Sequence, residues 1–116
     1  MIKRKDYFFK KAKKEGYLAR SSYKLIELNR KYNLIKRNSD VLDVGCSPGS
    51  WVQVCLKLNV RRIVGVDIEK AKIEDKKFEF HNEDIGKIEI DKFGKFDTVL
   101  SDISPKTKGF FDAEES

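Results

Sequence analysis

The stretch "DVLDVGCSPGSWVQ", residues 40–53, places a short hydrophobic segment directly before a loop of glycine, proline and small side chains. We interpret residues 41–44 as an apolar run, which is typical of a β-strand buried on both faces. Gly45 and Gly49 can adopt positive φ and let a ligand approach the backbone. A helix expected at 50–58 would direct its first N–H groups toward that ligand. The stretch therefore predicts a strand, a ligand-binding loop and a helix in succession.

Two well-known nucleotide-binding loops do not match this one. A Walker loop requires Gly-Lys-Ser or Gly-Lys-Thr, and the dinucleotide fingerprint requires G-x-G-x-x-G, which residues 46–49 interrupt. Asp67 lies 22 residues after Gly45, about where an acidic residue holds ribose hydroxyls in nucleotide-binding α/β folds. The loop thus favours a nucleoside without phosphates, and S-adenosylmethionine is such a molecule.

The remaining pattern predicts an α/β fold with a parallel sheet of about four strands, preceded by a helical extension. Helices are expected at 5–15 and 20–33, with Gly16 between them, and strands at 41–44, 61–67, 78–84 and 95–102. In the second helix, the spacing of Leu25, Leu28, Tyr32 and Ile35 predicts one apolar stripe.

Right-handed crossovers place the carboxyl ends of all parallel strands at one edge of the sheet. The loop from Gly45 to Trp51 follows the first predicted strand, and Asp67, Asp84 and Asp102 follow the others. Open α/β sheets bind their ligands at this edge. Each acid alone is typical of a solvated turn, but the four positions together indicate a binding site.

Charge is distributed unevenly along the chain. Residues 1–40 contain 13 Lys and Arg against 4 Asp and Glu, a net charge of +9, whereas residues 41–116 have a net charge of −3. We therefore divide the chain into a basic N-terminal segment, 1–38, expected to face a polyanion such as RNA, and a ligand-binding α/β part, 39–116. A solvated, charged helix face is the alternative interpretation of the basic segment.

Composition indicates one globular domain of 116 residues, with 40% hydrophobic and 38% charged residues. No apolar run approaches the roughly 20 residues of a membrane span, and the basic N-terminus lacks the apolar stretch of a secretory signal. Cys46 and Cys55 fit neither a disulfide framework nor a metal motif, so we expect a reduced, cytoplasmic chain. His81 is the one histidine, and we predict no metal site.

Three segments resemble the FtsJ-like (RrmJ-type) ribose 2'-O-methyltransferases of RNA, a family that uses S-adenosylmethionine. They are "DYFFKKAKKEGYLARSSYKLIELNRKY" (6–32), "VLDVGCSPGSWVQ" (41–53) and "VLSDISPKTKG" (99–109). The second is similar to a cofactor loop ending in Pro-Gly-Gly-Trp, with Ser50 in place of the second glycine. The resemblance implies a Rossmann-like methyltransferase fold.

The resemblance also implies roles for individual residues in cofactor binding. Gly49 and Trp51 would line the cofactor pocket, beside Gly45 of the same loop. Asp67 would hold the ribose hydroxyls and Asp84 the adenine amino group. Asp102 would lie beside the methionine part of S-adenosylmethionine and the reacting centre.

For catalysis, Lys24 and Asp102 match the first lysine and the aspartate of the family's Lys-Asp-Lys-Glu set. A lysine can remove the hydroxyl proton if its pKa is lowered toward neutrality. The family's C-terminal strands, its second lysine and its glutamate have no match here. We therefore expect this chain alone to be inactive. We also expect its fourth strand to pair with a second copy of the chain or with a partner chain.

The resemblance favours large-subunit ribosomal RNA as the substrate, with transfer RNA as the second candidate. The alternative is a non-enzymatic module that binds RNA or a nucleoside, either a degenerate relative or half of a split enzyme.

Overall fold

The computed structural model describes residues 3–101 of the chain. Its elements are α1 (Arg4–Glu15), α2 (Ser22–Tyr32), β1 (Asp40–Val44), α3 (Ser50–Lys57), β2 (Arg62–Val66), β3 (Phe78–His81), the 3₁₀ turn η1 (Ile90–Phe93) and β4 (Thr98–Ser101). The predicted succession of two helices followed by alternating strands and helices or turns is confirmed.

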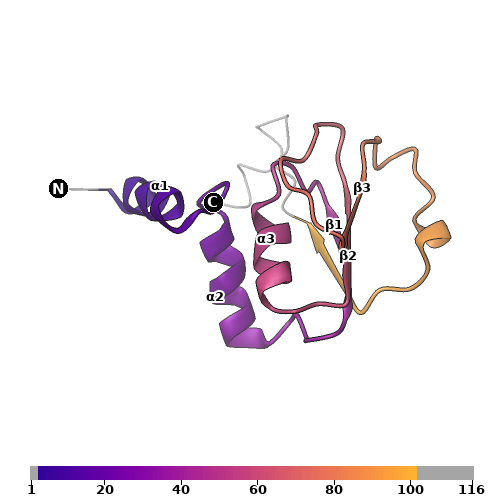
Figure 1. Cartoon of the computed structure of the whole chain (residues 1–116), viewed down its shortest axis with the longest axis horizontal. Helices are drawn as coiled ribbons and strands as arrows, with labels where there is room; N and C mark the ends of the chain where they lie inside the picture. Colours follow the sequence, from indigo (N-terminus) through magenta and orange to yellow (C-terminus); the bar gives the residue numbers. More distant parts are fainter. Residues whose placement is uncertain (1–2, 102–116) are drawn as a thin grey trace, which may run out of the picture.

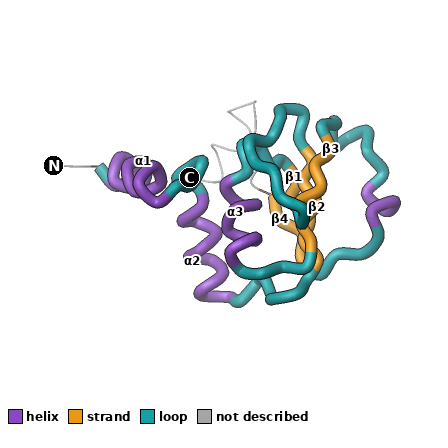
Figure 2. The backbone as a smooth tube through the Cα atoms, in the orientation of Figure 1, coloured by secondary structure: helices purple, strands orange, loops and turns teal. Residues whose placement is uncertain are grey.

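The four strands form one parallel sheet with the order β3-β2-β1-β4 (Figures 1 and 2). Val44, the last residue of β1, pairs with Val66 at the end of β2 and Ser101 at the end of β4. The chain moves outward from β1 to β3 and then returns to the other side of β1, so the strand order reverses between β1 and β4. This is the Rossmann-like arrangement that the sequence predicts, and its reversal point lies at β1.

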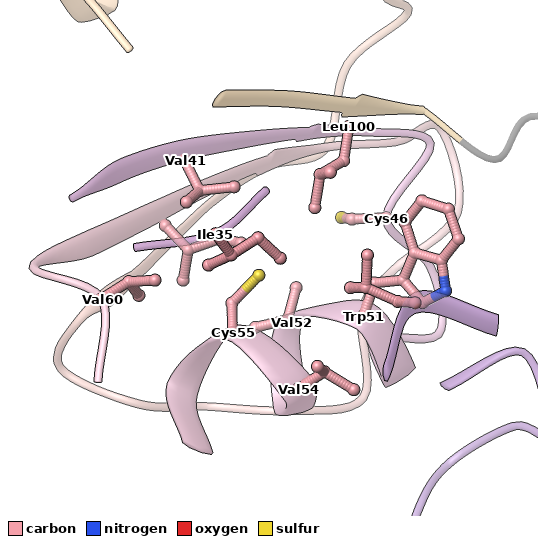
Figure 3. Close-up of a cluster of buried hydrophobic side chains, with 11 residues drawn as sticks. Ile35, Val41, Cys46, Trp51, Val52, Val54, Cys55, Val60 and Leu100 are labelled. Atoms are coloured by element: carbon pink, nitrogen blue, oxygen red, sulfur yellow. The ribbon is translucent and has the colours of Figure 1, made fainter. Parts of the chain in front are cut away.

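The two faces of the sheet are covered differently. The helix α3 packs on one face, where its Val52 and Cys55 meet Val41 of β1 in a buried cluster (Figure 3), and α2 packs against α3 on the same side (Figure 1). On the other face, Leu42 and Val64 are covered by partly buried side chains that come from the segment between β3 and β4: Ile85, Ile88, Ile90, Phe93 and Phe96. Figure 1 shows this segment, with its single turn of 3₁₀ helix, on the side of the sheet opposite α3.

Several predicted boundaries were too wide. The third strand ends at His81 rather than at residue 84, and the fourth begins at Thr98 rather than at residue 95. The stripe on α2 is only partly correct, since Leu25 and Ile35 are buried but Tyr32 is 58% exposed. Tyr32 is the last residue of α2, and its side chain lies beyond the part of the helix that packs against the core.

The first helix is attached to the rest by a short turn and projects away from the sheet (Figure 1). Gly16 ends it with a left-handed conformation, φ 85°, in which its N–H group reaches the carbonyls of Ala12 and Lys13. Ala12 is its one buried residue. Within residues 3–101, no helix is long and apolar enough to cross a membrane.

Candidate functional site

The loop after β1 lies where the strand order reverses. Gly45 has φ 79° and Gly49 has φ 124°, both in the region that favours glycine. A Cβ atom added at Gly49 would also lie 2.9 Å from Cγ2 of Ile73. The N–H group of Gly45 donates to the carbonyl of Val66 at 2.8 Å, which ties the loop to the end of β2. The backbone at both glycines thus requires the residues that the sequence analysis singled out.

Asp67 follows β2 directly and fastens this loop. Its Oδ2 accepts a hydrogen bond from the N–H of Ser47 at 2.8 Å, and its Oδ1 accepts one from the N–H of Glu69 at 2.9 Å. Each carboxylate oxygen has two lone pairs, so these bonds leave acceptor capacity for ligand hydroxyls. Asp67 can therefore shape the loop and bind a ribose at the same time.

Asp84 and Asp102 are the two remaining acids predicted at this edge of the sheet. Asp84 lies in an exposed turn three residues beyond β3, where its Oδ1 accepts a hydrogen bond from the N–H of Gly86 at 2.9 Å. Asp102 comes immediately after Ser101, the last residue of β4, but it lies outside the described residues. Asp84 therefore lies beyond the carboxyl end of β3 rather than at the end of the strand itself, and the roles of both acids stay predictions.

Trp51 is buried in the core against α2, at the first turn of α3. Its indole N–H donates to the carbonyl of Ser21 at 2.8 Å, and it also lines a small cavity beside the glycine loop. Ser50 adds a contact between its Oγ and the Oγ of Ser21 at 2.9 Å. The tryptophan thus joins the loop after β1 to the start of α2.

Gln53, on the same helix, fixes the turn between α1 and α2. Its Oε1 accepts from the N–H of Leu18 at 2.8 Å, and its Nε2 donates to the carbonyl of Gly16 at 3.0 Å. Sequence reasoning missed Gln53, because a glutamine on a predicted helix gives no sign of a partner 35 residues away. Together with Trp51, it sets the position of the N-terminal segment relative to the loop.

Asp43 is a second residue that the sequence analysis missed. It lies at the centre of β1, is 1% exposed, and lines the small cavity beside the loop. The interpretation of residues 41–44 as apolar was wrong at this position. The signal available in the sequence was an acid within an otherwise hydrophobic strand, which is rare unless the carboxylate has partners.

The cavity bounded by Asp43, Ser21, Trp51 and the glycine loop has a volume of about 50 Å³. This volume is far below the roughly 300–1,000 Å³ of common ligand sites. Burial, with the carboxylates of Asp43 and Asp67 adding to it, raises the pKa of Cys46 to about 12. Cys46 is therefore a neutral thiol at neutral pH and not a nucleophile.

Lys24 is exposed on the first turn of α2, three residues after Ser21. Residues three apart on a helix share a face, and the Ser21 carbonyl is bound by Trp51. Lys24 also lines a groove between α1 and α2. The structure thus places Lys24 at the groove between α1 and α2, and it is not among the residues that line the cavity beside the glycine loop. Its catalytic role stays a prediction.

The loop after β1 lies where the strand order reverses, contains two glycines with positive φ, and is bound by an acid at the end of β2. These features are those of a Rossmann-like protein of the methyltransferase type. The chain belongs to the FtsJ-like methyltransferase family, whose model matches residues 17–116. Members of this family use S-adenosylmethionine.

The chain is similar to proteins named ribosomal RNA large subunit methyltransferase E. It is 37% identical to the one from Methanothrix thermoacetophila over 97% of this chain and 46% of the relative. It is 44% identical to the one from Brachyspira hyodysenteriae over 92% of this chain and 58% of the relative. The chain therefore spans about half the length of the curated relatives that it matches.

Among solved structures, the fold is similar to that of a Plasmodium falciparum protein described as a ribosomal RNA methyltransferase. The TM-score is 0.68 at 33% sequence identity, covering 80% of this chain and 59% of that protein. A Lactococcus lactis protein described as a hemolysin matches with the same TM-score at 19% identity, and this second likeness concerns the fold alone.

Proposed function

We propose that this chain takes part in S-adenosylmethionine-dependent methylation of a ribose 2'-hydroxyl in RNA, with large-subunit ribosomal RNA as the favoured substrate. The observation that carries the proposal is the pairing of Asp67 with the glycine loop, in a member of the FtsJ-like family. We expect the protein to act in the cytoplasm, and transfer RNA is the second candidate substrate.

The residues at the edge fit the cofactor in their chemistry. S-adenosylmethionine supplies an electrophilic methyl group on a sulfonium. Asp67 offers acceptor oxygens suited to ribose hydroxyls, and the positive φ of Gly45 and Gly49 shapes the loop beside it. Asp84, exposed beyond β3, is the proposed acceptor for the adenine amino group. Trp51 would support cofactor binding mainly by holding the loop after β1 in place.

Methyl transfer needs the ribose oxygen held in line with the methyl group, and it needs the hydroxyl proton removed. Lys24 lies three residues after Ser21, which itself lines the cavity at the loop. We propose that Lys24 holds the ribose hydroxyl and, with Asp102, forms this chain's share of the catalytic set.

The test is transfer of a labelled methyl group to large-subunit ribosomal RNA, with the modified position mapped to a ribose oxygen. We expect the chain extended to the full length of its relatives to label the RNA, and the 116-residue chain alone to be inactive. Lys24→Ala in the extended protein should abolish transfer while cofactor binding remains. An extended protein that binds cofactor and RNA without transferring methyl groups would instead support the non-enzymatic alternative.

The basic segment 1–38 is the proposed RNA-facing part, and 39–116 the cofactor-binding part. Replacing Lys10, Lys11, Lys13 and Lys14 together by glutamine should lower the slope of log K against log salt. The expected reduction is about 3 if each lysine contacts a phosphate of single-stranded RNA. The measurement is a fluorescence anisotropy titration at several salt concentrations.

A matched control changes the charge of the chain by the same amount elsewhere. Four exposed lysines lie in the loop between β2 and β3, and all would be replaced by glutamine: Lys70, Lys72, Lys76 and Lys77. This control should leave the salt slope near that of the parent. Equal slopes for the α1 variant and the parent would mean that the basic helix is only a solvated face.

We also propose that the free edge of β4 pairs with another strand, from a second copy or a partner. Among the described strands, β4 lies at one end of the sheet, and Val99 on it is 62% exposed. Unpaired strand edges with apolar side chains invite pairing. We expect light scattering to show self-association that Val99→Lys reduces, whereas Ile68→Lys, at a residue 66% exposed in a loop, should not. A parent that is monomeric at all concentrations would contradict this proposal.

A further inference from the structure

A groove of about 780 Å³ lies between α1 and the start of α2. Its volume is within the roughly 300–1,000 Å³ of common ligand sites. Phe8 and Phe9 of α1 form one side, and Leu18, Arg20 and Lys24 lie across from them. The helix α1 precedes residues 17–116, the part of the chain that the family model matches.

Two aromatic rings of α1 that line this groove each have a cation nearby. Phe9 is 52% exposed, and the Nζ of Lys13 lies 5.3 Å from the centre of its ring. The guanidinium carbon of Arg4 lies 5.1 Å from the centre of the Phe8 ring. Proteins that bind single-stranded nucleic acid combine a basic groove with aromatic rings on which bases stack.

The charge of the groove is complementary to a phosphate chain. Its charged lining residues are Arg4, Lys5, Arg20, Lys24 and Glu27. The one acid among them, Glu27, lies 4.0 Å from the guanidinium of Arg4, so part of its charge is offset. A phosphate in this groove would therefore meet mainly cations.

The groove also leads to the candidate cofactor site. Ser21 lines both the groove and the small cavity beside the glycine loop. Trp51 and Gln53 hold the turn that carries Ser21, so the two spaces keep a fixed relation. An RNA strand with one ribose at the cavity would have its neighbouring nucleotide at the groove.

We propose that this groove binds an unpaired RNA nucleotide next to the methylated ribose, with its base stacked on Phe9 and its phosphate among the cations. The proposal rests on the proposed function and adds the single-stranded character of the substrate at this point. Because any base can stack on an aromatic ring, the groove would position the RNA without selecting a particular base.

The test uses a short single-stranded RNA oligomer that contains several 2-aminopurine bases, whose fluorescence falls when they stack. For the 116-residue chain, Phe9→Ala should weaken binding roughly tenfold and remove the fluorescence quenching. The salt slope should stay unchanged, because the phosphate contacts remain. Phe9→Trp should restore both affinity and quenching, which a loss of folding could not explain.

Tyr32, in the same basic segment but not among the residues that line this groove, provides a matched control at the far end of α2. It is 58% exposed, and the Nζ of Lys31 lies 5.3 Å from its ring centre, so its surroundings resemble those of Phe9. Tyr32→Ala should leave affinity and quenching unchanged. Salt-dependent RNA binding with undiminished affinity and quenching in Phe9→Ala would overturn the stacking proposal while leaving the proposed function intact. If the parent does not bind RNA, the RNA-facing role fails and the groove proposal with it.

Discussion

Replacing Asp67 by alanine should weaken S-adenosylmethionine binding by about 1.5–3 kcal/mol, the usual cost of losing hydrogen bonds to a charged group. Two physical effects contribute. The ribose loses its acceptor, and the N–H group of Ser47 loses the carboxylate that holds the loop in place. Isothermal titration calorimetry of the chain with the cofactor measures the change directly.

Asp75→Ala is the matched control for this variant. Oδ1 of Asp75 accepts a hydrogen bond from the N–H of Lys77 at 2.9 Å, the same local bond that Asp67 makes with Glu69. Asp75 precedes β3 and therefore lies at the opposite edge of the sheet from the glycine loop. Its replacement should leave the cofactor affinity unchanged. Equal affinities for parent and Asp67→Ala would remove Asp67 from the site.

Gly65→Ala should lower the free energy of unfolding by about 1–3 kcal/mol, as is typical of overpacked cores. Gly65 lies within β2, and a Cβ atom there would be 2.6 Å from the Sγ of Cys46 and 2.8 Å from the ring of Phe78. Both neighbours are held by the core, so the loop that carries Cys46 must shift. Urea denaturation followed by circular dichroism measures the loss, and cofactor affinity should fall with it.

Two comparisons isolate the cause of that loss. Gly86→Ala should be close to neutral, because the nearest atom to its added Cβ would be Oδ1 of Asp84 at 3.4 Å. In a Cys46→Ala background, the cost of Gly65→Ala should shrink, since the closest clashing atom is gone. A cost of Gly65→Ala that is the same with and without the Cys46 sulfur would show that the close approach does not matter.

Much of the fold could be predicted because its signals are local. Hydrophobic runs mark the strands, and Gly16, Gly45 and Gly49 have the left-handed backbone that makes glycine informative. The end of β3 was predicted too late, at residue 84, although Asn, Asp and, to a lesser degree, Glu, which occupy positions 82–84, are depleted in strands. The strand ends where its partner β2 ends, at the pair of His81 with Val66.

The sequence allowed us to propose the strand-end residues of the candidate site, but it did not reveal the hydrogen bonds that support them. Asp67 and the glycines follow from strand ends and spacing. Gln53 and Ser21 act through hydrogen bonds to groups about 30 residues away or more, and no period in the sequence reports such pairs. Asp43 shows a different limit, since a buried acid within a strand becomes meaningful only when the cavity beside it is known.

Our central proposal is that the carboxyl edge of the sheet binds S-adenosylmethionine. The most direct measurement is a titration of the ¹⁵N-labelled chain with the cofactor, followed by amide chemical shifts. We predict that the largest shifts fall on the loop 45–51, on residues 67–69 and on the turn around Asp84, while the amides of α1 stay in place. Shifts confined to the groove between α1 and α2, or no shifts at high cofactor concentration, would contradict the account.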